Sequence, residues 1–283
     1  MLRINIRHQT TYEYTAPVRF GQHQLVLRPR EGHDQRIGEM RLSIEPAHAV
    51  TWVRDIYGNS IGIVDFLKEA SRLDIVSEVA VERFDFFPEK RLHEPWSVKW
   101  PVVYDERERT LSEAYLVPSY PADQREIREW HHLQGTFAYD AEGLMLALCE
   151  RVHSTIKYRR RLETGVQSPA ETLRLTSGSC RDMATLLMDL ARALGVASRF
   201  VSGYLHGTAS MAGHASTHAW SEVYLPALGW RGFDPTTGAA VGLHHIATGV
   251  SQHPRGVMPV SGSFNGTMGK FLNMRVQVAT TVA

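Results

Sequence analysis

The spacing of apolar residues changes once along the chain, and this change constrains the fold more than any other feature. Up to about residue 87 apolar and polar side chains alternate, and Leu73, Ile75, Val79 and Val81 share one parity. A period of two is typical of strands that bury one face. From Met145 onward apolar residues recur every three to four positions, which is the period of a helix. The sequence therefore predicts a half-buried antiparallel sheet followed by a mixed α+β segment.

Prolines separate the two segments. Five of the 13 prolines in the chain fall in one stretch: Pro88, Pro95, Pro101, Pro118 and Pro121. Proline fixes φ and biases the preceding residue toward extended structure, so this stretch predicts a long connection without regular elements. Such a connection is unusual inside one compact domain. We expect a β-rich domain over residues 1–100, a proline-rich connection over residues 101–122 and an α+β domain over residues 123–283.

The charge balance and the composition exclude several classes of function. The chain has 31 Lys+Arg against 30 Asp+Glu and no basic block, so neither a nucleic acid nor a polybasic membrane contact is indicated. No apolar run approaches the roughly 18 residues of a membrane span, and residues 1–7 lack the apolar core of a signal peptide. Two cysteines cannot build a disulfide framework or an all-thiolate metal site. We therefore expect a cytoplasmic protein that binds neither nucleic acid nor membrane.

The two cysteines lie in different settings. Cys149 belongs to the apolar stripe of a predicted helix, where a thiol behaves as a small hydrophobic side chain of low reactivity. Cys180 follows the small residues 177–179 and directly precedes an amphipathic helix that we expect to end at Gly195. Helix N-termini favour the thiolate, and a backbone N–H there can donate to an oxyanion. The sequence therefore predicts a core role for Cys149 and makes Cys180 a candidate nucleophile.

A base and an orienting carboxylate follow Cys180 in the chain. His218 stands near the start of a predicted strand, and Asp234 ends the next strand after a short turn at residues 226–229. Pairing about that turn sets positions near 220 opposite positions near 234, so Asp234 is within reach of the His218 ring. Taken singly, His218 could be an ordinary surface or core histidine, and the Asp-Pro-Thr segment could be an ordinary turn. The combination and its order point to a Cys-His-Asp arrangement.

Three segments, residues 178–182, 217–220 and 232–236, read Gly-Ser-Cys-Arg-Asp, Thr-His-Ala-Trp and Gly-Phe-Asp-Pro-Thr. They resemble motifs of the transglutaminase-like superfamily of papain-like cysteine enzymes. Residues 10–14, 27–30 and 33–35 resemble the β-rich N-terminal domain of bacterial transglutaminase-like proteins, whereas residues 249–255 differ from the more acidic, aromatic stretch common in that family. The resemblance implies a papain/transglutaminase-like catalytic core, with a nucleophile helix packed on an antiparallel sheet, preceded by a small all-β domain.

The same resemblance implies a chemistry. Cys180 would be the nucleophile, His218 the base and acid, and Asp234 the carboxylate that orients the histidine. A peptide or protein amide would form a thioester on Cys180, and water or an amine would then complete hydrolysis or transamidation. No calcium or nucleotide site is evident in the sequence, so we expect no cofactor. Two alternatives stay open: a catalytically silent fold that acts as a protein-binding or scaffold module, and a transferase for a small acyl or amide donor.

The remaining candidates have weaker support. His214 and His218 are four residues apart but outside a helix, so a zinc-protease site is not indicated, and we expect no metal. The histidine pairs at 131–132 and 244–245 and the arginines at 159–161 are interpreted as solvated. Tyr158 and Gln167 are candidates for a second oxyanion donor, and Trp220 for either a cleft wall or a core residue. Asp182 in the first helical turn is explained by the helix dipole.

Overall fold

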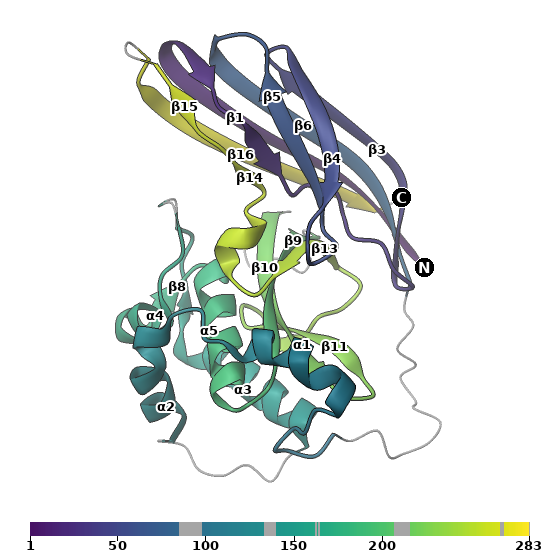
Figure 1. The fold of residues 1–283 in the computed structure, drawn as a ribbon, viewed down its shortest axis with the longest axis vertical. Helices are drawn as coiled ribbons and strands as arrows, with labels where there is room; N and C mark the ends of the chain where they lie inside the picture. The colour runs from purple at the N-terminus through teal and green to yellow at the C-terminus, as the bar shows by residue number, and fades with distance from the viewer. Residues whose placement is uncertain are drawn as a thin grey trace.

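The computed structural model describes residues 1–84, 98–132, 140–161, 163, 165–206, 216–266 and 269–282. Figure 1 shows two stacked parts, with β-sheets at the top and helices packed on a further sheet below. The predicted fold class is confirmed: a β-rich N-terminal part precedes a core of helices packed on an antiparallel sheet. Within the described residues, no helix is both long and apolar enough to cross a membrane.

Two antiparallel sheets form the upper part, which we call the β module. In one, β1 (Leu2–Phe20) is flanked by β6 (Ala70–Arg83) and β16 (Phe271–Val282), β3 (Gln35–Glu45) pairs with β6, and β15 (Phe264–Asn265) pairs with the end of β1. The other has the order β14 (Val260–Ser261), β2 (His23–Leu25), β5 (Ser60–Phe66) and β4 (His48–Arg54). Buried side chains of both sheets, among them Phe20, Val64 and Ile75, share one apolar cluster. The predicted alternation therefore buries one face of each sheet in a common core.

The lower part, which we call the core module, is built on a five-stranded antiparallel sheet. Its order is β12 (Ala239–Ala240), β11 (Gly229–Asp234), β10 (Ser216–Leu225), β9 (Ser198–Leu205) and β13 (His245–Ser251). The helices are α1 (Glu106–Leu116), α2 (Gln124–His132), α3 (Ala141–Thr155), α4 (Pro169–Leu175) and α5 (Cys180–Ala193), with short turns η1 (Pro121–Asp123) and η3 (Pro254–Val257). Strands β7 (Lys157–Tyr158) and β8 (Ser177–Gly178) form a small parallel pair.

Helix α5 forms where the sequence predicts it. Its apolar stripe, including Met183, Leu187 and Leu190, is fully buried against α3 and the sheet. Ser179 is the N-cap residue, and the helix ends before Gly195, whose φ of 76° is the left-handed conformation expected there. The apolar period and the end signals therefore place the N-terminus of this helix at Cys180.

The C-terminal residues correct the predicted domain boundaries. We expected residues 123–283 to form one domain, but β16 pairs with β1 from Ile4–Val282 to Tyr14–Phe271. Strands β14 and β15 likewise pair with β2 and β1. The chain thus returns to the β module after completing the core module, because β1 is an internal strand that needs a partner on both edges. Nothing local in the sequence identifies β1 and β2 as the partners of these strands.

The proline-rich connection contains a helix. Residues 101–122 were expected to lack regular structure, yet α1 occupies half of this range. Pro101 precedes the helix and Pro118 follows it, and Asp105 caps its start by accepting from the N–H groups of Arg107 and Glu108 at 2.8 and 2.9 Å. The prolines therefore flank the helix and do not interrupt it. Pro88 and Pro95 lie outside the described residues.

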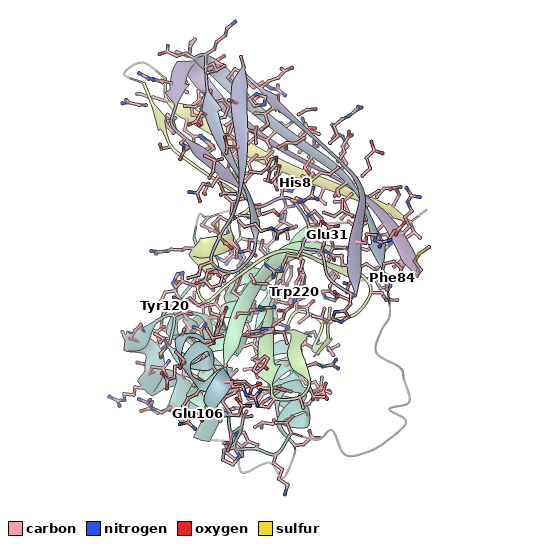
Figure 2. All side chains as sticks on the ribbon, turned by 45° about the vertical axis from the view of Figure 1, so that its right-hand side comes forward. His8, Glu31, Phe84, Glu106, Tyr120 and Trp220 are labelled. Atoms are coloured by element: carbon pink, nitrogen blue, oxygen red, sulfur yellow. The ribbon has the colours of Figure 1, made fainter. Side chains whose placement is uncertain are left out.

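The β module is fastened to one edge of the core sheet. The Asn59 side chain donates to the Val250 carbonyl at 2.8 Å and accepts from the Val250 N–H at 2.9 Å, as a neighbouring strand would. The Arg30 N–H donates to the Ala247 carbonyl at 2.8 Å. His8 on β1 also bonds the Tyr204 hydroxyl at 2.9 Å, and Figure 2 shows His8 on the side of the β module that faces the core module. Strand β13 is thus held by β9 on one side and by the β module on the other.

Candidate active site

Cys180 is the first residue of α5 and is half-buried. A first-turn N–H has no carbonyl partner within its own helix, so the backbone N–H of Cys180 is available beside the sulfur. The thiol packs near an apolar cluster that includes Ala184 and Ala219 of the core module and Val26 and Ile61 of the β module. Both modules therefore contribute to the surroundings of this cysteine. Cys149, in contrast, is fully buried among apolar residues, and burial raises the pKa of its thiol strongly, as the sequence predicts for a core residue.

A buried carboxylate shapes the turn that presents Cys180. Asp182 is fully buried. Its Oδ2 accepts from the N–H and the hydroxyl of Ser179 at 2.7 and 2.8 Å, and its Oδ1 accepts from the Gln167 N–H and from Nη1 of Arg161, each at 2.8 Å. The helix dipole alone is thus an incomplete explanation of Asp182. The interpretation of residues 159–161 as a solvated run is wrong for Arg161, whose side chain is only 15% exposed.

His218 and Asp234 meet as the strand register predicts. In the β10–β11 pair Ser221 lies opposite Phe233, so Asp234 falls opposite Trp220 and diagonal to His218 on the same face. Nε2 of His218 is 2.8 Å from Oδ2 of Asp234, and both side chains are buried. With Nε2 engaged by the carboxylate, Nδ1 is the ring nitrogen left for Cys180, which lies close enough to contribute to the raised pKa of the imidazole. The structure brings the three predicted residues together.

Electrostatics strengthens this arrangement. Burial by itself lowers the pKa of His218, but the charge and hydrogen bond of Asp234, with a smaller contribution from Cys180, raise that pKa to about 10. Burial by itself raises the pKa of Asp234, yet the hydrogen bonds and charges of His218 and His245 hold it well below its ordinary value. An imidazolium paired with an ionised carboxylate is therefore the favoured state near neutral pH.

A second histidine belongs to this site and was missed by the sequence analysis. His245, interpreted there as solvated, is buried, and its Nε2 lies 3.0 Å from Oδ2 of Asp234. It is the first residue of β13, the edge strand next to β9, so it approaches Asp234 from the opposite edge of the sheet. Only the strand order reveals this neighbour, because β13 follows β11 in the chain yet lies two strands beyond β10. The pair His-His at 244–245 carries no local signal for it.

The ligand atoms of His218, Asp234 and His245 lie within 4.8 Å of one another, close enough to be tested as a metal site. The Gly242 N–H donates to Nδ1 of His245 at 3.3 Å, so Nδ1 is an acceptor and the proton resides on Nε2. A protonated Nε2 donates to a carboxylate and cannot coordinate a metal. The contacts thus favour two hydrogen bonds to Asp234 over a shared ion.

The other predicted candidates lie around the same helix start. Tyr158 pairs with Gly178, two residues before Cys180, and burial followed by the charge of Cys180 raises the pKa of its hydroxyl. Gln167 is buried, and its Oε1 accepts from the Thr172 hydroxyl at 3.4 Å. Both remain candidates for a second oxyanion donor. His214 and the side chains at 131–132 lie outside the described residues.

Trp220 is a core residue. Its side chain is 1% exposed, and its ring lies 6.3 Å from that of His218 and 5.2 Å, edge to face, from that of His245. Figure 2 shows Trp220 within the sheet of the core module. It therefore packs against both histidines and does not form an exposed wall of the cleft.

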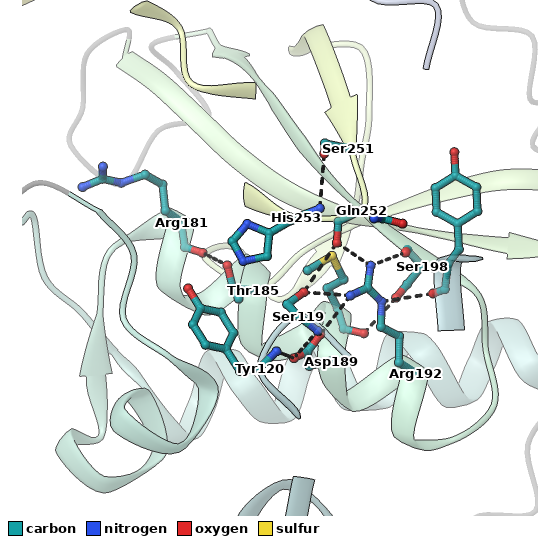
Figure 3. A network of polar contacts seen from close by, with 12 residues as sticks. Ser119, Tyr120, Arg181, Thr185, Asp189, Arg192, Ser198, Ser251, Gln252 and His253 are labelled. Atoms are coloured by element: carbon teal, nitrogen blue, oxygen red, sulfur yellow. Dashed lines mark hydrogen bonds and ion pairs between the residues drawn. The ribbon is translucent and has the colours of Figure 1, made fainter. Parts of the chain in front are cut away.

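Further along α5, a buried ion pair secures the segment that follows α1 (Figure 3). Asp189 accepts from the backbone N–H of Ser119 at 3.1 Å and pairs with Arg192 at 3.2 Å. Arg192 in turn donates to the Ser198 and Gln252 carbonyls at 2.9 and 2.7 Å. This network ties α5 to β9 and to the end of β13, so α5 is fixed at both ends.

Comparison with known proteins identifies two regions of this chain. Residues 4–82 match the model of the bacterial transglutaminase-like N-terminal region, and residues 137–235, which include Cys180, His218 and Asp234, match that of the transglutaminase-like superfamily. Both of these regions are thus transglutaminase-like. An uncharacterized protein of Mycobacterium tuberculosis is 28% identical to this transglutaminase-like chain over 276 residues, which are 92% of this chain and 87% of the relative. One of Mycobacterium leprae is 24% identical over 286 residues, 98% and 99% of the two chains.

A solved structure shares the fold of this transglutaminase-like chain. It is a protein of Cytophaga hutchinsonii, named for a proposed cysteine protease activity, with a TM-score of 0.75. The similarity covers 99% of this chain and 90% of the other at 19% sequence identity. At that identity the likeness shows the common fold, in which the β module accompanies the core module.

Proposed function

We propose that this protein is a cysteine-dependent amide-bond enzyme, a peptide or isopeptide hydrolase or a transamidase, that works through a thioester on Cys180. The observation that carries the proposal is the buried pair of His218 and Asp234, 2.8 Å apart, beside a half-buried Cys180 thiol at a helix N-terminus. A nucleophile, a base and a group that orients the base are the parts such a reaction requires.

The proposed reaction starts from the Cys180 thiolate and the His218 imidazolium. The sulfur attacks the amide carbonyl carbon, and the Cys180 N–H donates to the developing oxyanion. His218 then gives its proton to the leaving amine as the carbon–nitrogen bond breaks, which leaves a thioester. Water or an incoming amine loses a proton to His218 and attacks the thioester, which releases an acid or a new amide and restores the thiolate. Asp234 keeps its charge and holds the imidazole ring throughout.

The substrate class proposed here is a peptide or protein amide. The apolar cluster beside Cys180 draws residues from both modules, which supports a site shaped in part by the β module. Cytoplasmic location, and the absence of nucleic-acid and membrane partners, stay predictions from composition.

Alkylation tests the activated thiolate. Wild-type protein, Cys180→Ala and His218→Asn are treated with iodoacetamide at pH 6, and modification at each cysteine is followed by mass spectrometry. We expect wild-type Cys180 to react faster than an unstructured cysteine peptide, whose pKa is about 8.5, and His218→Asn to lose this advantage. Equal rates for Cys180 and the peptide would refute the activated nucleophile.

Acylation tests the reaction. A peptide library is incubated with the protein, with and without an added amine, and adducts of Cys180 are sought by mass spectrometry. An acyl adduct that needs both Cys180 and His218 supports the enzyme, and its conversion to acid or amide distinguishes hydrolysis from transamidation. An activated thiol with small acyl donors as the only substrates would favour the small-molecule transferase instead. No dependent acylation from either donor class would favour the scaffold module.

A further inference from the structure

We infer that His245 is a positioning residue that, in the proposed reaction, holds the Asp234 carboxylate in the orientation His218 requires. The inference rests on the proposed function for its catalytic meaning and on the contacts of His245 for its geometry. Both imidazoles meet the same oxygen: Nε2 of His218 at 2.8 Å and Nε2 of His245 at 3.0 Å from Oδ2 of Asp234. Among the described residues, no hydrogen bond joins His245 to Cys180, so any effect of His245 on Cys180 passes through the Asp234 carboxylate.

The tautomer of His245 suits this role. The Gly242 N–H donates to its Nδ1 at 3.3 Å, which leaves the ring proton on Nε2, where it points at Asp234. His245 is then a neutral donor. It can stabilise the carboxylate without taking its proton, so Asp234 keeps its charge for the His218 imidazolium.

The rest of Asp234 is held as well. Its Oδ1 accepts from the N–H and the hydroxyl of Thr236 at 2.9 and 2.7 Å. With His245 present, each oxygen has two donors, and the carboxylate plane has one satisfied orientation. Without His245, Oδ2 keeps only the bond to His218, which is the group that moves protons during the reaction. A second donor is therefore what keeps the carboxylate in place as the charge of His218 changes.

The backbone of His245 is itself anchored by both modules. Residues of β13 pair with β9, and the β module adds the bonds from Asn59 to Val250 and from Arg30 to Ala247. The Trp220 ring packs edge to face against the imidazole at 5.2 Å. The β module thus contributes to the geometry of the site through β13, in addition to its apolar residues near Cys180.

Other titratable groups face the same carboxylate. His218 contacts it directly, and the charge of Asp234 contributes to raising the pKa of Cys149 on α3 and of Tyr158 on β7. Within the described part of the chain, neither Cys149 nor Tyr158 is hydrogen-bonded to Asp234, so neither replaces the donor that His245 supplies.

Two variants of the full chain test the inference. His245→Leu has a similar volume and no donor, whereas His245→Gln retains an N–H of similar reach. The rate of Cys180 alkylation is measured from pH 4 to 10, with thermal unfolding as a check on folding. We expect the acid limb of the His245→Leu profile to move up by about one pH unit, a tenfold loss of thiolate below the limb, because a misplaced His218 stabilises the anion less. We expect His245→Gln to restore the wild-type limb.

An unchanged profile for a folded His245→Leu would overturn the inference, and so would a His245→Gln profile that shifts as far as His245→Leu. If His245→Leu does not fold, nitrogen-15 shifts of the wild-type imidazoles decide: at pH 7 His245 is expected to carry its proton on Nε2, and a proton on Nδ1 overturns the inference. Failure of the proposed function is distinct from these results, because it shows as an unactivated Cys180 in the wild-type protein itself.

Discussion

Asp182→Asn is the most informative single change outside Cys180, His218 and Asp234. The substitution keeps the shape of the side chain and removes its charge. One oxygen can still accept from the Gln167 N–H and from Arg161, but an amide nitrogen then faces the Ser179 N–H, which the native carboxylate satisfies at 2.7 Å. Two donors facing each other cannot bond, so the turn before Cys180 must open.

The size of the effect follows from burial. Asp182 is 0% exposed and the Arg161 side chain 15%, so solvent screens their ion pair little. A buried donor left without an acceptor costs about 1–3 kcal/mol, and breaking a buried ion pair about 3–5 kcal/mol. The two terms overlap in one cluster, and Arg161 retains Glu163 at 3.7 Å, so we expect a loss of about 3–5 kcal/mol in the free energy of unfolding.

Urea unfolding of Asp182→Asn and of the wild type measures this loss, and iodoacetamide reactivity of Cys180 reports the local geometry. Glu171→Gln is the matched control, because Glu171 is an exposed carboxylate in the first turn of α4 and its loss should change the free energy by less than about 0.5 kcal/mol. If Asp182→Asn loses less than about 1 kcal/mol and Cys180 keeps its alkylation rate, the assigned role of this carboxylate is wrong.

Three further outcomes follow from the same structure. Asn59→Leu leaves the N–H and carbonyl of Val250 unsatisfied beneath the β module, so urea unfolding should show a loss of about 2–4 kcal/mol; a loss below about 1 kcal/mol would contradict the anchoring role. Burial lowers the pKa of His8 to about 4, so the free energy of unfolding should fall by at most about 3 kcal/mol as the pH falls from 6.5 to 4. A His8→Gln variant that loses just as much over this pH range would exclude His8 as the cause. The pH dependence that His218 contributes has the opposite sign, because its raised pKa of about 10 adds stability below pH 6.5 that is lost between pH 6.5 and 10. Asp234→Asn should remove this alkaline loss in thermal unfolding, and an unchanged alkaline slope would exclude the His218–Asp234 pair as its source.

Local patterns account for much of the site. The apolar period and the small residues before Cys180 place the thiol at the start of α5, and Gly195 ends that helix in the left-handed conformation. The short turn at residues 226–229 sets the β10–β11 register, which brings Asp234 to His218. These features depend on neighbouring residues in the sequence or on one hairpin, so the sequence is sufficient to predict them.

Other features required the tertiary structure. His245 and Asp182 look ordinary in the sequence, yet both are buried acceptors or donors whose partners lie on other elements. The prolines around α1 led to the prediction of a connection without regular structure. Only the cap at Asp105 shows that these prolines flank a helix and do not interrupt one. For His245 and Asp182 the decisive contact was a hydrogen bond between segments, whereas the cap at Asp105 is local.

The sequence alone determined that a β-rich part precedes an α+β part, where α5 begins and that His218 pairs with Asp234, because helix ends, periods and hairpin register are local properties. The tertiary structure decided that β16 returns to β1, that Asn59 fastens the β module to β13 and that His245 shares Asp234 with His218. These contacts join residues far apart in the chain, and their partners are selected by the packing of whole sheets. No local preference of the residues involved encodes that choice.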